Sequence, residues 1–176
     1  ERSPALSLTT LPGDGGIRTR KVAILVAEGL LGTSIATVVQ ALTAADAVPC
    51  IVAYALGAVG TTDGTALHAT ATFENSSPVL FDAVVLPDGE AGVAQLAQNR
   101  AVQAFISSHY HHGKTMLVLG ASEVLVEQAG INTFLRGMVP DPGVILSSST
   151  QVTEGTAQFI HAIGQHRHME RLLALT

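Results

Sequence analysis

A short apolar segment runs into a predicted helix through a sharp turn at Gly120. The segment Thr115–Leu119 has the composition of a buried strand, and Gly120, Ala121 and Ser122 follow it. In enzymes built on open α/β sheets, a strand-to-helix elbow of this kind carries the Ser or Cys nucleophile. Glycine has no side chain with which to attack. The sequence therefore predicts a degenerate elbow with no catalytic residue, and a structural or assembly role for the chain.

Two side chains near the elbow could still supply chemistry. Ser122 lies two residues past the turn, where a hydroxyl typically caps a helix, so we expect capping rather than attack on a substrate. Glu28 follows the first predicted strand and should face the same crevice. It is a candidate acid if it is buried, and an ordinary loop carboxylate if it is exposed. A hydrolase would need a nucleophile, a base and oxyanion donors in one place.

Histidines gather in two parts of the chain. They are His109, His111 and His112 at the end of a predicted helix, and His161, His166 and His168 near the C-terminus. His109 continues an apolar helical stripe and is expected to pack in the core, whereas the C-terminal histidines should lie on a solvated or subunit-contacting face. Tetrahedral zinc needs Cys or carboxylate partners that the neighbouring sequence does not offer, so no metal site is expected. The single cysteine, Cys50, begins an apolar strand and should be buried and inert.

The loop from Glu28 to Ser34 is the only candidate cofactor loop in the sequence. It has a faint likeness to a flavin phosphate loop, but it lacks a dense Ser/Thr run and a nearby aromatic residue. No cofactor is therefore expected in this chain.

Composition excludes several classes of function. The 176 residues are 47% hydrophobic and 13% charged, which is typical of one compact domain. A net charge of −5 argues against nucleic acid as a partner, and no apolar run is long enough to predict a membrane span. One cysteine fits a reducing compartment, so we expect a cytoplasmic protein. The start at Glu1, without Met, suggests a piece of a longer polypeptide or a processed chain.

Strands alternate with helices along the chain. Apolar strands are predicted at 21–27, 49–54, 81–86, 115–119 and 144–146. Helices are predicted from about 33 to 42, where Thr33 or Ser34 can serve as the cap, from 91 to 112 with a break near Asn99, from the elbow to Ala129, and at 153–165 with a continuation toward Leu173. A β-hairpin turning at Asp63-Gly64 should follow the second strand. The first 20 residues read as a linker or arm, and residues 21–176 as one domain. The fold class is α/β, a flavodoxin-like three-layer sandwich with a mostly parallel sheet and an added β-hairpin.

Several segments together resemble a known family. They are Ser3–Ser7, Arg20–Val26, Asp63–Thr65, Leu80–Pro87 and the tail His166-Arg167-His168. In this order they resemble the C-terminal domain of large-subunit haem catalases. That domain is itself similar to the superfamily of class I amidotransferases and DJ-1/PfpI-like proteins.

The resemblance implies what this chain has lost. Active protease-like relatives carry Cys-His at the elbow and a Glu in the loop after the first strand, and the matching positions here are Gly120, Ala121 and roughly Leu31. Haem would belong to an upstream barrel domain of the parent, which decomposes hydrogen peroxide and is a homotetramer. The implied function of this domain is non-catalytic: stability, assembly or substrate access.

Two alternatives stay open at the level of sequence. A DJ-1/PfpI-like hydrolase, deglycase or amidase would have to use Ser122, Glu28 or Cys50. A holdase would bind unfolded client proteins through apolar surface, for which the mean hydropathy of +0.39 is the motive.

Overall fold

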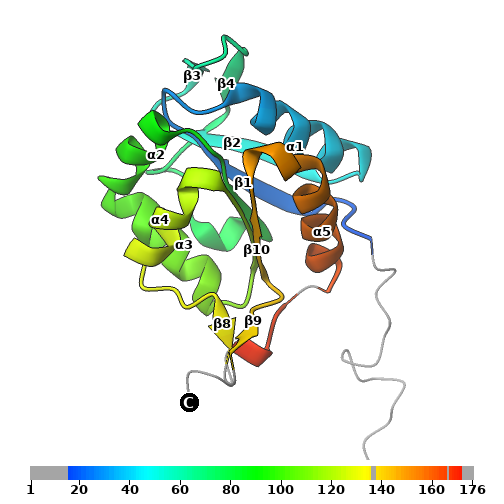
Figure 1. Cartoon of the computed structure of the whole chain (residues 1–176). Helices are drawn as coiled ribbons and strands as arrows, with labels where there is room; N and C mark the ends of the chain where they lie inside the picture. Colours follow the sequence, from blue (N-terminus) through cyan, green and yellow to red (C-terminus); the bar gives the residue numbers. More distant parts are fainter. Residues whose placement is uncertain (1–15, 136–137, 166, 172–176) are drawn as a thin grey trace, which may run out of the picture.

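A six-stranded parallel sheet forms the centre of the molecule (Figure 1). The computed structural model describes residues 16–135, 138–165 and 167–171. The strands lie in the order β10-β7-β6-β1-β2-β5. Their bounds are β1 Lys21–Leu25, β2 Val48–Ala53, β5 Ala71–Thr72, β6 Ala83–Leu86, β7 Thr115–Leu119 and β10 Val144–Ser147. The predicted α/β class is confirmed, while residues 1–15 of the predicted arm, His166 and Leu173 lie outside the described residues.

Helices cover both faces of the sheet. Figure 1 shows α1 (Gly32–Ala44) beside α5 (Val152–Gly164) on one face, and α2 (Glu90–Ala97), α3 (Arg100–His111) and α4 (Glu123–Gln128) on the other. The predicted break between α2 and α3 is confirmed. Asn99 lies there and accepts a hydrogen bond from the backbone N–H of Ala101 at 2.8 Å, which caps α3.

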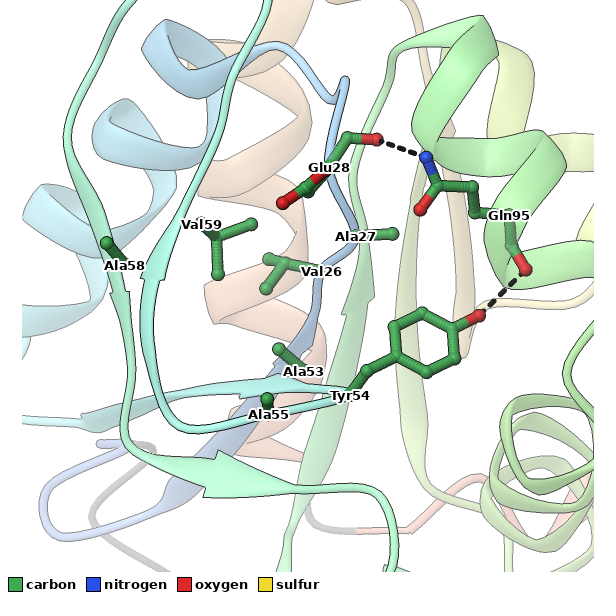
Figure 2. Close-up of a pocket in the computed structure, with 9 residues that line it drawn as sticks. All are labelled: Val26, Ala27, Glu28, Ala53, Tyr54, Ala55, Ala58, Val59 and Gln95. Carbon is green, nitrogen blue, oxygen red and sulfur yellow. Dashed lines mark hydrogen bonds between the residues drawn. The ribbon is translucent and has the colours of Figure 1, made fainter.

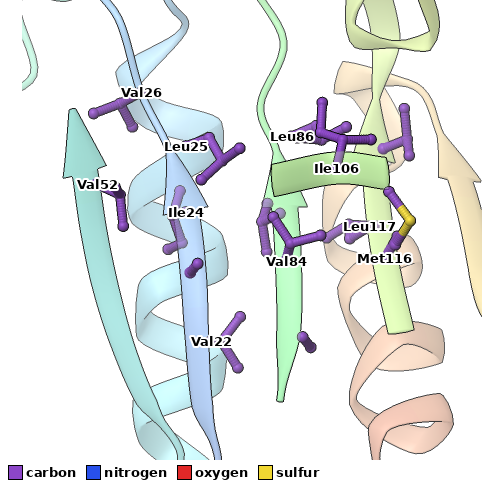
Figure 3. Close-up of a cluster of buried hydrophobic side chains, with 14 of the residues drawn as sticks. Val22, Ile24, Leu25, Val26, Val52, Val84, Leu86, Ile106, Met116 and Leu117 are labelled. Atoms are coloured by element: carbon purple, nitrogen blue, oxygen red, sulfur yellow. The ribbon is translucent and has the colours of Figure 1, made fainter. Parts of the chain in front are cut away.

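The central strands are buried on both sides, as their apolar runs require. All five residues of β7 and all four of β6 are buried. Figure 3 shows their side chains in the core, among them Val84, Leu86, Met116 and Leu117, with Ile106 of α3 packed over them. This core fixes the carboxyl ends of β1, β6 and β7, which carry the loops of the candidate site.

The predicted hairpin is present and reaches back to the start of α1. It consists of β3 (Gly57–Val59) and β4 (Leu67–Ala69), which pair antiparallel. From its connecting loop, Asp63 Oδ2 accepts a hydrogen bond from the backbone N–H of Thr33 at 2.8 Å. The prediction that Thr33 or Ser34 caps α1 is therefore wrong. The helix already begins at Gly32, and the hydroxyl of Ser34 donates back to the carbonyl of Leu31 at 2.8 Å.

A buried ion pair fastens the C-terminal segment to the sheet. Arg171 donates to both carboxylate oxygens of Asp141, at 2.6 and 3.0 Å, and both side chains are fully buried. Its guanidinium also donates to the backbone carbonyls of Tyr110 and Lys114, each at 3.0 Å, and lies over the Tyr110 ring. Because every one of these partners lies outside the C-terminal segment, Arg171 ties that segment to the body of the domain.

Candidate functional site

The elbow after β7 has the predicted shape. Gly120 adopts a left-handed φ of +50°, and a short 3-10 turn over Gly120–Ser122 leads into α4. The predicted capping role of Ser122 is wrong. Ser122 is fully buried, and its hydroxyl donates to the backbone carbonyl of Pro87, the residue that follows β6, at 2.5 Å. This hydroxyl therefore joins the turn after β7 to the loop after β6.

The carboxylate of Asp88 fills the space where a nucleophile would stand. A Cβ built on Gly120 would lie 2.3 Å from Asp88 Cγ, a separation that real Cβ atoms do not adopt. Asp88 Oδ1 accepts hydrogen bonds from the backbone N–H groups of Ala121 and Gly89, each at 2.8 Å. Donors of this kind hold the oxyanion in acyl-transfer enzymes. Here they bind a carboxylate that belongs to the chain.

Three loops converge on Asp88. Its backbone carbonyl accepts a hydrogen bond from Leu31 N at 2.9 Å, in the loop after β1. Gly89 has a φ of +129°, and a Cβ there would lie 2.7 Å from Leu30 Cα, so only glycine allows this approach. Asp88 is not among the candidate residues that the sequence suggests. The usable signal was its position at the end of β6, next to the elbow strand in the sheet.

Glu28 is exposed and does not lie at the elbow. It lines a cavity of about 300 Å³ between the ends of β1 and β2 and the hairpin, with Val26, Ala53 and Val59 among the apolar lining. Figure 2 shows its carboxylate turned toward Val59, while its backbone carbonyl accepts from Gln95 Nε2 at 3.3 Å. The expectation that Glu28 shares the crevice of the elbow is therefore wrong, since the described lining of this cavity includes none of Gly120, Ala121 or Ser122.

The N-terminus of α1 is occupied in the same way as the elbow. Hydrogen bonds from the backbone N–H groups of Thr33 and Thr65 to Asp63 lower the pKa of this carboxyl well below its usual range. A flavin phosphate bound in this loop would have to displace the Asp63 carboxylate.

The histidines are divided between core and surface. His109 is fully buried and stacks on Phe105, so the prediction of a core histidine is confirmed. His168 is 2% exposed and shares a hydrogen bond with the Thr115 hydroxyl at 3.1 Å. The expectation of a solvated C-terminal face is wrong for this residue, because the tail folds back onto β7. His111, His112 and His161 are exposed.

Cys50 is half-buried rather than buried. Its sulfur lies 3.5 Å from the Thr70 hydroxyl, beside the short edge strand β5. The burial predicted for this thiol is therefore only partial, since β5 pairs with β2 only at Val52 and Ala53 and does not reach Cys50.

The two tyrosines do not fit an axial haem ligand of the kind that catalases use. The Tyr54 hydroxyl donates to the Gln95 carbonyl at 2.8 Å, and the Tyr110 hydroxyl donates to the Asn132 carbonyl at 2.9 Å. Burial raises the pKa of Tyr110, which disfavours its phenolate further. Within residues 16–135, 138–165 and 167–171, no three His, Cys, Asp or Glu side chains gather as metal ligands would. In the same part of the chain, none of the helices has the length and apolar character needed to cross a bilayer.

Comparison with known sequences gives one consistent family. A family model described as the C-terminal domain found in long catalases matches residues 18–173. Catalase HPII of Pseudomonas putida is 32% identical over 170 residues, which cover 97% of this chain and 22% of that protein. Catalase-2 of Bacillus subtilis is 31% identical over 172 residues, which cover 96% of this chain and 23% of that protein. The chain thus spans less than a quarter of the length of these relatives.

Comparison with solved structures gives the fold. Drosophila melanogaster DJ-1beta superposes with a TM-score of 0.73 at 15% identity, over 88% of this chain and 94% of that one. A ThiJ/PfpI domain protein of Brachyspira murdochii superposes with a TM-score of 0.73 at 13% identity, over 84% of this chain and 98% of that one. These likenesses confirm the flavodoxin-like architecture.

Proposed function

Because the chain belongs to the family of C-terminal domains found in long catalases, we propose that it is the non-catalytic appended domain of a haem catalase. The parent decomposes hydrogen peroxide with haem held in an upstream barrel domain and assembles as a homotetramer. The domain described above contributes to the stability and assembly of that parent, or to substrate access. We also propose a cytoplasmic location.

The observation that carries this proposal is the closed elbow. Gly120 offers no nucleophile, and the Asp88 carboxylate fills the space that a side chain at position 120 would need. The same carboxylate accepts the hydrogen bonds of the backbone N–H groups of Gly89 and Ala121, which could otherwise bind an oxyanion. A DJ-1/PfpI-like hydrolase, deglycase or amidase would need Ser122, Glu28 or Cys50. The hydroxyl of Ser122 is buried on Pro87, Glu28 lines a separate cavity, and Cys50 lies half-buried beside Thr70. A fold held this firmly, without reacting groups at its elbow, suits a supporting domain.

Deletion from the full-length parent tests the proposal. We expect the parent without residues 18–176 to keep its haem absorbance and its peroxide turnover per haem at low temperature. It should lose activity faster on heating or dissociate from the tetramer more readily. The isolated chain should show no Soret band and release no oxygen from peroxide.

Three results would contradict the proposed role. The first is turnover by the isolated chain. The second is loss of haem chemistry at all temperatures in the deleted parent, and the third is unchanged stability, assembly and KM for peroxide. The matched control is the full-length parent carrying Glu74→Gln, which leaves the elbow intact and should behave as the wild type does.

A further inference from the structure

We propose that the cavity beside Glu28 binds a small primary amine, a protonated ammonium group joined to a short apolar chain. The ammonium group pairs with the Glu28 carboxylate, and the apolar chain occupies the cavity. This site lies apart from the elbow, and the inference does not depend on the role proposed for the domain in a catalase.

The first support is the form of the cavity. It lies at the carboxyl ends of β1 and β2, and the carboxyl edge of an open α/β sheet is where ligands bind. Its volume of about 300 Å³ is at the lower end of the range for small-molecule sites, so it suits a ligand of few atoms. Three of its lining residues, Val26, Ala53 and Val59, are buried and apolar (Figure 2). Such a lining favours a hydrocarbon chain over a polar one.

The second support is an unpaired charge at the cavity. Figure 2 shows the Glu28 carboxylate turned toward Val59. Among the described residues this carboxylate has no ion pair and no hydrogen-bond donor, because Gln95 donates to the backbone carbonyl of Glu28 instead. The described lining of the cavity includes no Lys, Arg or His. A cationic ligand is therefore attracted to this cavity, and an anionic one is repelled.

The third support is that hydrogen bonds already join the walls of the cavity. The Tyr54 hydroxyl donates to the Gln95 carbonyl at 2.8 Å, and Gln95 Nε2 donates to the Glu28 carbonyl at 3.3 Å. These two bonds connect the segments that follow β1 and β2 to α2. The Tyr54 ring also packs edge-on against Phe73, with ring centres 5.2 Å apart. A ligand therefore enters a formed cavity, and little of its binding free energy is lost in ordering side chains.

Pentylammonium chloride is the probe, with 1-pentanol and sodium pentanoate as neutral and anionic analogues of the same length. The titrations are made at about 0.15 M salt, which screens general attraction to a chain of net charge −5. The amine should shift the methyl NMR signals of Val26 and Val59 in a saturable way. Pentanol should shift them with lower affinity, and pentanoate should leave them unchanged.

Glu28→Gln removes the charge and keeps the size of the side chain. It should bind pentylammonium about fivefold more weakly, at the upper end of the effect of an exposed ion pair. Glu28→Asp keeps the charge on a shorter side chain and should bind with intermediate affinity. Glu74→Gln is the matched control, because Glu74 is exposed and does not line the cavity, and it should bind the amine as the wild type does.

Ala58→Leu tests the cavity independently of the charge. Ala58 is exposed on β3 and lines the cavity, so a larger side chain there should fill the space without disturbing the core. Neither pentylammonium nor pentanol should then bind. Undiminished binding by Ala58→Leu would overturn the proposal. So would equal affinity of the amine for the wild type and Glu28→Gln, binding of pentanoate as tight as that of the amine, or the absence of a saturable shift in the wild type.

Discussion

His109 is a titratable side chain locked in its neutral form. A carbonyl can only accept, so Nδ1 donates to the Phe105 carbonyl at 3.1 Å, while Nε2 is buried without a hydrogen-bond partner among the described residues. Burial, reinforced by the charge of Lys114, lowers the pKa of His109 from 6.5 to about 3. Protonation therefore favours the unfolded chain.

This predicts a stability that falls on acidification. Between pH 6.5 and about 3, His109 is protonated in the unfolded chain but not in the folded one. The contribution of neutral His109 to the free energy of unfolding is therefore fully present above pH 6.5 and declines below it. The loss is about 1.4 kcal/mol per pH unit. His168, whose pKa burial also lowers, adds to the slope. Urea unfolding of His109→Phe at several pH values should give a flatter profile, whereas His161→Phe, exposed on α5, should match the wild type.

Asp63, in its exposed loop, also loses its contribution to stability on acidification, but at lower pH. Its pKa is lowered chiefly by the N–H of Thr33, so its contribution is complete above the usual carboxyl pKa of 3.8 and is lost as pH falls further. Asp63→Ala should lower Tm at pH 6 and make a smaller difference at pH 2. Glu74→Ala provides the control in another exposed part of the chain. An equal loss at both pH values would contradict the capping role of this carboxylate.

The elbow shows which parts of the candidate site could be predicted from the sequence. The absence of a nucleophile at Gly120 can be read from the short strand Thr115–Leu119 and the glycine that follows it. The occupancy of the site by Asp88 cannot, because it depends on a contact between residues 33 positions apart. For the same reason Ser122 was assigned to capping, although its hydroxyl partner is Pro87.

At the scale of elements, the C-terminal segment depends on one buried ion pair. Removing one partner of such a pair leaves an uncompensated buried charge, which costs about 3–5 kcal/mol. Arg171→Met should therefore lower the free energy of unfolding by that order, measured by urea titration. Arg20→Met provides the comparison, since its pair with Asp82 is about one-third exposed and is worth about 1 kcal/mol or less. Similar losses in both variants would contradict the anchoring role of Arg171.

The strands were predictable, whereas the group that caps α1 was not. The strands β1, β6 and β7 are short apolar runs between polar turns, and burial on both faces follows directly from that pattern. The start of α1 depends on Asp63, which lies 30 residues away in the hairpin loop. Local sequence therefore suggested Thr33 or Ser34 as the cap.

At the scale of the whole molecule, the strands β8 (Phe134–Leu135) and β9 (Val139–Pro140), at the bottom of Figure 1, carry exposed apolar residues. Phe134, Met138 and Val139 are 41%, 77% and 56% exposed. We predict that the isolated chain suppresses the thermal aggregation of a client protein in light-scattering assays, because exposed apolar patches bind unfolded chains. The variant Met138→Ser/Val139→Ser should suppress it less, and Val79→Ser, exposed elsewhere, should not differ from the wild type. No suppression at molar excess would remove the holdase role.

The architecture as a whole followed from the alternation of strands and helices, since parallel strands joined by helices leave few arrangements. The tail was different. His168 and Arg171 lie in a polar stretch that predicts a solvated surface, yet both are buried because β7, Asp141 and the backbone carbonyls of α3 and its following turn provide partners.

The mutual fit of Gly120 and Asp88 has a consequence for the history of the domain. A lineage that acquired a cysteine at position 120 alone would meet a steric clash, and one that shortened Asp88 alone would gain a hole but no reactive atom. A lineage would therefore need two simultaneous substitutions, at positions 120 and 88, to place a nucleophile at this elbow.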